Sequence, residues 1–102
     1  MLLIRKLAEI MEEMVYVRKT KDDEPFVTTN DLGYVDPILK GFRLTYWPND
    51  TFHDDYAAFW LERGKGYSWE CVIEVKCKAF GSYGHMACMF ISAVNFCDKI
   101  GS

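Results

Sequence analysis

The clearest pattern of hydrophobic and polar positions lies in the segment 67–80. Alternate positions of one parity are hydrophobic or thiol side chains: Trp69, Cys71, Ile73, Val75 and Cys77. The positions between them are mostly charged: Glu70, Val72, Glu74, Lys76 and Lys78. Because successive side chains on a strand point to opposite sides, this alternation predicts a strand with one buried and one solvated face. We therefore expect the tryptophan and both thiols to point into the core.

Two shorter segments also indicate a sheet. The stretch 42–47 alternates, with one parity on each face: Phe42, Leu44 and Tyr46 against Arg43, Thr45 and Trp47. The stretch 26–29, after Pro25, is a candidate for a short edge strand. Between these two, Asp36, Pro37 and Gly41 fit the N-cap, the first position and the end of a single helical turn.

Three segments show helical spacing. In 1–19, hydrophobic residues recur at alternating steps of four and three: Leu3, Leu7, Ile10, Met14 and Val17. Segment 49–64 has capping residues at its start and Gly64 at its end. Its alternative is a strand over 56–62 that enters a hairpin at 63–66, and we favour the helix. Segment 84–101 separates a polar stripe from hydrophobic positions only as a helix, and a buried strand paired with 67–80 is its alternative.

The order helix, loop, strand, helix, strand, helix predicts an α+β fold. We expect a small single domain over 1–102, with a two- to four-stranded sheet and about three helices packed on it. A strand–helix–strand unit with a full crossover would make two of the strands parallel. The length leaves room for one domain only.

The composition and charge of the chain argue against nucleic-acid binding and membrane association. Half of the chain is hydrophobic, 16% is aromatic and the net charge is −3, with lysines and arginines spread evenly rather than in a basic stripe. Nucleic acid is therefore not an expected partner. The longest apolar run, 86–91, is far shorter than the ~20 residues that span a bilayer. Arg5 and Lys6 interrupt the apolar start, which is unlike a secretory signal. We expect no membrane association, a cytoplasmic location in the producing or host cell, and free thiols.

Two clusters are candidates for chemistry. His85 and Cys88 lie three residues apart on the predicted last helix, where both could face one zinc ion or the imidazole could activate the thiol. Further ligands, an oxyanion donor and an orienting acid are not identifiable, so we interpret the pair as part of an exposed polar stripe. The cluster His53, Asp54 and Asp55 fits the capped first turn of a helix. We therefore predict no catalytic residue, no metal and no cofactor.

The aromatic residues suggest two kinds of contact. Four of them lie near basic residues and could stack on bases: Tyr46, Trp47, Tyr67 and Trp69. Acidic residues share the same segment and the total charge is negative, so we favour packing in the core for these four. Aromatic residues are nevertheless more numerous than one small core can bury, and tryptophan and tyrosine often anchor protein interfaces.

These observations lead to three functional hypotheses. The preferred one is a non-catalytic protein-binding module, an inhibitor or adaptor of a larger protein complex, with partner-binding residues Tyr34, Trp47, Trp60 and Tyr83. The small size of the chain suggests a phage or mobile-element accessory protein. The second is a small metal- or thiol-dependent enzyme that uses His85 and Cys88. The third is a structural subunit that self-associates through the first helix, so the chain is expected to be a monomer or a homodimer.

Overall fold

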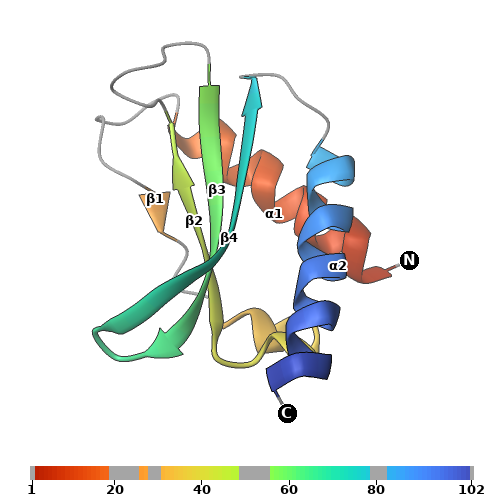
Figure 1. Ribbon diagram of the computed structural model, residues 1–102. Helices are drawn as coiled ribbons and strands as arrows, with labels where there is room; N and C mark the ends of the chain where they lie inside the picture. The colour runs from red at the N-terminus through yellow and green to blue at the C-terminus, as the bar shows by residue number, and fades with distance from the viewer. Residues whose placement is uncertain (1, 19–25, 28–30, 49–55, 79–82, 102) are drawn as a thin grey trace.

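The computed structural model describes residues 2–18, 26–27, 31–48, 56–78 and 83–101. The elements follow in this order: α1 (Leu2–Arg18), β1 (Phe26–Val27), the 3-10 turns η1 (Leu32–Tyr34) and η2 (Pro37–Leu39), β2 (Phe42–Trp47), β3 (Tyr56–Lys65), β4 (Ser68–Lys78) and α2 (Tyr83–Gly101). Within these residues the four strands form one antiparallel sheet in the order β1-β2-β3-β4. Both helices lie on one side of this sheet and contact each other (Figure 1).

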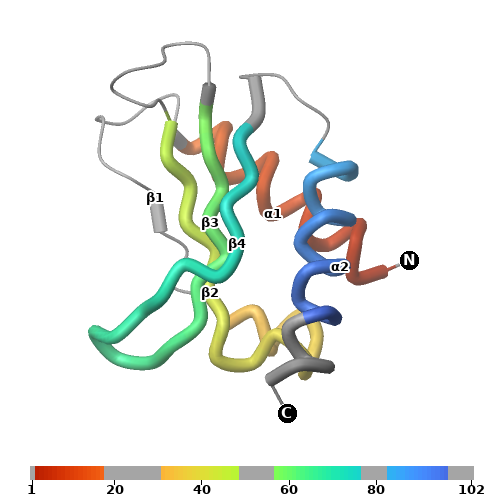
Figure 2. The backbone as a smooth tube through the Cα atoms, viewed as in Figure 1, coloured from red at the N-terminus to blue at the C-terminus, as the bar shows by residue number. Residues whose placement is uncertain are grey.

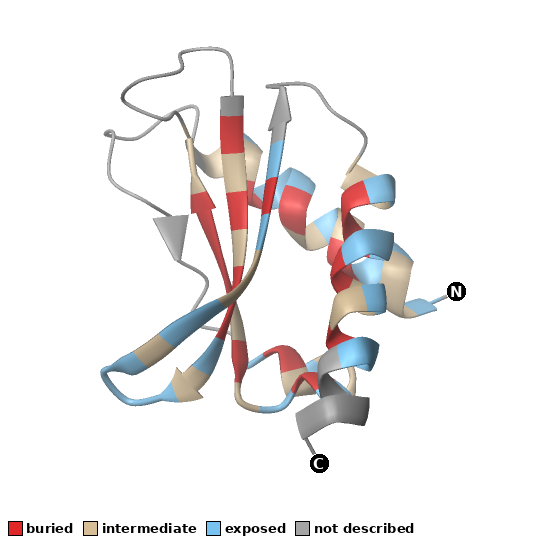
Figure 3. Cartoon of the chain, viewed as in Figure 1, coloured by how far each residue is buried: buried red, intermediate tan, exposed pale blue. Residues whose placement is uncertain are grey.

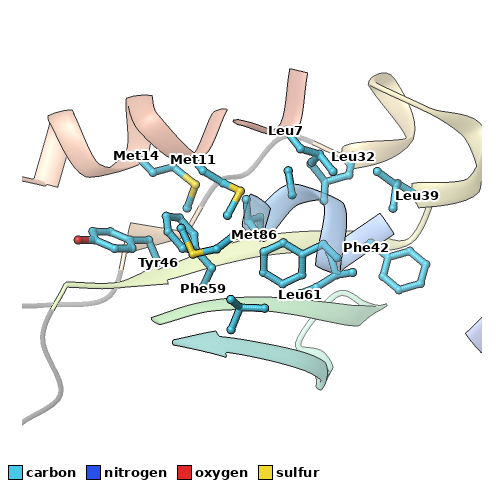
Figure 4. Close-up of a cluster of buried hydrophobic side chains, with 14 of the residues drawn as sticks. Leu7, Met11, Met14, Leu32, Leu39, Phe42, Tyr46, Phe59, Leu61 and Met86 are labelled. Atoms are coloured by element: carbon cyan, nitrogen blue, oxygen red, sulfur yellow. The ribbon is translucent and has the colours of Figure 1, made fainter. Parts of the chain in front are cut away.

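The core lies between the sheet and the two helices. From β2 and β3, alternate residues point toward the helices: Phe42, Leu44, Tyr46, Ala57, Phe59 and Leu61. Side chains from α1 and α2 meet them: Leu7, Met11, Met14, Met86, Phe90 and Val94. Figure 4 shows the methionines and leucine of α1 pointing at this layer of aromatic and aliphatic side chains. Burial is concentrated on the inner sides of the elements (Figure 3).

Several expectations from the sequence are confirmed. The helices predicted over 1–19 and 84–101 are α1 and α2, and the strand over 42–47 is β2 with the expected faces. The turn after Asp36 is η2, whose first residue is Pro37, and the Asp36 carboxylate caps it by accepting from Ile38 N–H at 2.9 Å. The edge strand predicted over 26–29 is β1 at Phe26–Val27, and residues 28–29 lie outside the described part of the chain. An α+β small domain is therefore correct, although the described helices are two α-helices rather than about three.

The helix predicted over 49–64 is wrong for its described part, because 56–65 is strand β3. The alternative, a strand entering a hairpin, is the observed structure, while residues 49–55 lie outside the described part. Lys65 pairs with Ser68, so Gly66 and Tyr67 form a two-residue turn in which Gly66 takes a φ of 62°. Each described strand is antiparallel to its neighbours, so the expected parallel crossover is also wrong.

The expected faces of the 67–80 strand are correct only in its second half. Leu61 pairs with Ile73 but Glu62 pairs with Cys71, so Val72 is an extra residue in β4, a β-bulge. Ile73 and Val75 pack toward the helices as expected. Before the bulge the alternation is reversed, and Cys71 is exposed on the opposite side of the sheet. The prediction that Trp69 and Cys71 point into the core is therefore wrong, and the Cys77 side chain lies outside the described part.

None of the described helices is long and apolar enough to cross a membrane. The hydrophobic stripe of α1 is used inside the chain, because Leu7 and Met14 are buried against the sheet and α2. A dimer seam built on these two side chains would have to compete with the core.

Candidate partner-binding face

The side of the sheet that carries none of the described helices is here called the open face. By strand pairing this face includes Arg43, Thr45, Trp47, Ala58, Trp60, Glu62, Trp69, Cys71, Glu74 and Lys76. Directly paired residues in an antiparallel sheet point to the same side. The three tryptophans of the chain all lie on this face. The bulge at Val72 brings Trp69 to it, since without the extra residue Trp69 would point toward the helices.

A buried carboxylate lies at the centre of the open face. Glu62 is only 7% exposed and Thr45 beside it 3%. Arg43 donates to both carboxylate oxygens, from Nε at 3.1 Å and from Nη2 at 3.3 Å, and the Thr45 hydroxyl donates to Oε1. A carboxylate this far from water is tolerated when a cation and hydrogen bonds compensate its lost hydration. The Glu62 cluster, defined as Arg43, Thr45 and Glu62, is therefore a rigid polar unit linking β2 to β3.

Arg43 also connects this cluster to the hairpin between β3 and β4. This hairpin extends past the first residue of β2 (Figure 2). Its guanidinium carbon lies 4.4 Å from the centre of the Trp69 ring, within the range of a cation–π contact. The Trp69 indole N–H donates to the Gly66 carbonyl at 2.8 Å. The guanidinium is thus held between a carboxylate and an indole ring.

The other two tryptophans form a pair further along the face. The ring centroids of Trp47 and Trp60 are 4.8 Å apart and their planes are inclined by 45°. Trp60 donates its indole N–H to Glu74 Oε2 at 2.7 Å. The Trp47 indole nitrogen is buried, and the described part of the chain offers it no acceptor. Both residues are partly exposed, so the pair presents apolar ring surface on this face.

Cys71 is the exposed thiol of the open face. It donates a weak hydrogen bond to the Ile73 carbonyl at 3.5 Å. Partial burial of the thiol raises its pKa, and the Glu62 and Glu74 carboxylates raise it further because they disfavour a nearby thiolate. This thiol is consequently a poor nucleophile near neutral pH.

The structure brings together two of the four residues predicted to bind a partner. Trp47 and Trp60 contact each other on the open face, while Tyr34 lies in η1 and is 91% exposed. Tyr83 is at the start of α2, where its ring meets Phe59 edge-on at 6.1 Å on the helix side of the sheet. Trp69 also contributes to this face, which the sequence does not predict because a regular alternation through Val72 places its side chain in the core.

The residues considered for metal binding or catalysis are not part of the described open face. His85 and Cys88 are exposed on α2, in the other layer of the fold. Within the described residues no group of three or more histidine, cysteine or acidic side chains is arranged to hold a metal ion. His53, Asp54 and Asp55 lie outside the described part. Core packing, predicted for the four aromatics considered for base stacking, is correct for Tyr46 alone. Tyr67 is exposed at the hairpin turn, and Trp47 and Trp69 lie on the open face.

In comparisons with protein-family models, with curated proteins and with solved structures, nothing matches this chain.

Proposed function

We propose that the protein is a non-catalytic binding module, an inhibitor or adaptor that docks on a larger protein complex through its open face. The observation that carries the proposal is the gathering of all three tryptophans on the side of the sheet without a described helix. Tryptophan, tyrosine and arginine supply much of the binding energy at protein interfaces. Here the sheet places three indole rings and Arg43 within one continuous surface.

The rigidity of the face supports the same function. Trp60 and Trp69 are fixed by indole hydrogen bonds, and Arg43 is fixed by the Glu62 carboxylate. Side chains that are already ordered lose little conformational entropy when a partner binds. The face carries charges of both signs: Arg43 and Lys76 together with Glu62 and Glu74. An aromatic surface of mixed charge suits a protein partner better than a polyanion does.

We also propose an origin and a cellular location for the protein. A small non-catalytic module would suit a phage or mobile-element accessory protein that acts on a host complex in the cytoplasm of that cell. The partner would then be a host protein assembly.

The experiment is affinity capture of partners from a lysate of the native host cell. It compares the wild-type protein with variants whose open face is altered. Ala58→Arg places a long side chain at the middle of the open face, and Trp60→Ala removes one ring of the tryptophan pair on the same face. Ser92→Arg on the exposed side of α2 and Tyr67→Ala at the hairpin turn are the matched controls.

We expect the two open-face variants to lose the partner and the two controls to keep it, with circular dichroism confirming that all four are folded. Capture that is equal in all four folded variants would contradict the proposal. Loss in the Ser92→Arg variant alone would move the interface to α2.

A further inference from the structure

The Glu62 cluster shows how this face holds a guanidinium. Arg43 donates to the Glu62 carboxylate while its guanidinium carbon lies 4.4 Å from the Trp69 ring centre. The arrangement combines a carboxylate acceptor with an indole π-surface, and both favour a planar cation. It is an internal example of arginine recognition by this surface.

The open face contains a second carboxylate and indole set without such a cation. Glu74 accepts the Trp60 indole N–H at 2.7 Å through Oε2, and Trp47 packs on Trp60 at 4.8 Å. Glu74 is exposed. Within the described residues the ion pairs are Lys6–Glu9 and Arg43–Glu62, so Glu74 belongs to neither. Lys76 is the nearest cation along the strand and makes no described ion pair with Glu74.

We propose that Trp47, Trp60 and Glu74 form a receptor for an arginine side chain of the protein partner. The inference rests on the proposed function and adds the chemistry of the contact. A guanidinium stacked on the outer face of the indole pair would reach the Glu74 carboxylate with its N–H groups, as Arg43 does at Glu62. Arginine fits better than lysine because its guanidinium is planar, stacks on aromatic rings and donates in a fork.

Charge also selects the class of partner. The net charge of −3 attracts a basic protein segment and repels nucleic acid. A phosphate backbone near Glu74 would meet a negative charge, whereas an arginine would neutralise it. Lys76 on the same strand opposes a bound cation, so its removal should strengthen binding.

The test is a titration of the whole chain, labelled with ¹⁵N at the indole nitrogens, with N-acetylarginine amide and with its uncharged citrulline analogue. We expect saturable shifts of the Trp60 signal with the arginine compound, with a Kd of about 10 mM, which a cation–π contact and a charge-assisted hydrogen bond would supply together. Glu74→Gln should weaken binding about threefold or more, because it removes the charge. Its matched control, Glu70→Gln on the same strand, should leave binding unchanged because Glu70 pairs with Arg63 away from the open face.

The outcomes separate this inference from the proposed function. Equal binding of citrulline and arginine, or an unaffected Glu74→Gln variant, would overturn the arginine receptor. A rise in affinity for Lys76→Gln would support it. Saturable binding of oligothymidylate that weakens with salt would overturn it in favour of nucleic acid. If captured partners still require the open face while Glu74→Gln keeps them, the binding-module proposal stands and the arginine receptor fails.

Discussion

Glu62 is the residue on which the open face depends most. Its carboxylate is buried on a side of the sheet where a charge would ordinarily be solvated, and it accepts from Arg43 and Thr45. Removing one member of a buried charge pair is more damaging than the pair is stabilising, because the other charge loses its partner. The arginine here is partly exposed, with 28% of its side chain accessible, which limits that penalty.

The variant Glu62→Gln should therefore lower the free energy of unfolding by about 1–3 kcal/mol. The change keeps the size of the side chain and removes the charge that holds Arg43. Urea denaturation of Glu62→Gln and of Glu70→Gln compares a buried with an exposed position on the two sides of the same hairpin. The second variant should change stability by less than about 0.5 kcal/mol. Equal stability of both variants would show that the Glu62 cluster contributes nothing to folding.

Cys71 reports on the electrostatics of the same face. Burial and the carboxylates of Glu62 and Glu74 raise the pKa of its thiol. At a fixed pH just above neutrality, less of it is thiolate than of an unperturbed cysteine, so alkylation by iodoacetamide should be slower. Removing one of these charges by Glu74→Gln should lower the pKa and speed the reaction at that pH.

The measurement is the rate of Cys71 alkylation against pH, read by mass spectrometry of the peptide containing Cys71. The expected midpoint lies above the ordinary cysteine value in the wild type and moves down in Glu74→Gln. An unchanged midpoint in that variant would place the carboxylate farther from the thiol than the structure does.

At the scale of elements, the β3–β4 hairpin decides which side chains reach the open face. Gly64 lies where the hairpin closes, and a Cβ atom there would be 1.9 Å from the Ser68 carbonyl oxygen. Gly64 N–H also donates to the Gly41 carbonyl at 3.0 Å, which ties the hairpin to the start of β2. The close approach of two backbones requires a residue without a side chain at this position.

Gly64→Ala should consequently destabilise the fold by more than about 2 kcal/mol, since backbone would have to move to relieve the contact. Gly84→Ala is the matched control, because a Cβ at Gly84 meets no atom within 4 Å. Gly84 lies in α2, where alanine favours the helix, so this variant should be unchanged or more stable by up to about 1 kcal/mol. Thermal unfolding followed by circular dichroism compares them, and equal melting temperatures would contradict the hairpin geometry.

The elements also show what the sequence could and could not predict. The spacing of hydrophobic residues is sufficient for α1 and α2, and alternation is sufficient for both faces of β2. For β3 the sequence favours the wrong one of two alternatives, because Ala57, Ala58, Leu61 and Glu62 favour helices locally and only pairing with the neighbouring strands makes a strand. A bulge leaves no local signal, so the faces of β4 before Val72 could not be assigned. The buried Glu62 depends on Thr45, which lies 17 residues earlier in the chain.

At the scale of the whole molecule, the two sides of the sheet differ in the side chains that they carry. The helices and the inner side of the sheet form the hydrophobic core, which leaves the opposite side of the sheet with aromatic and charged side chains. Tryptophan is a large hydrophobic residue, and a stable domain of this size would gain by burying it. All three tryptophans lie on the open face and are only partly buried, and the proposed partner-binding role rests on this observation.

The burial of α1 separates the binding-module account from self-association through that helix. Leu7→Asp combined with Met14→Asp places two carboxylates in the core, so we expect the chain to unfold. Circular dichroism and light scattering measure folding and mass together. A folded monomer produced from a folded dimer by these two changes would instead support a dimer seam on α1.

The most direct measurement of the central claim is the ¹⁹F spectrum of the protein labelled with 5-fluorotryptophan, free and in complex with a captured partner. The three tryptophans give three signals and need no variant. The account predicts that all three shift on binding and become less accessible to a soluble relaxation agent. Three unchanged signals in a complex that is demonstrably formed would contradict it.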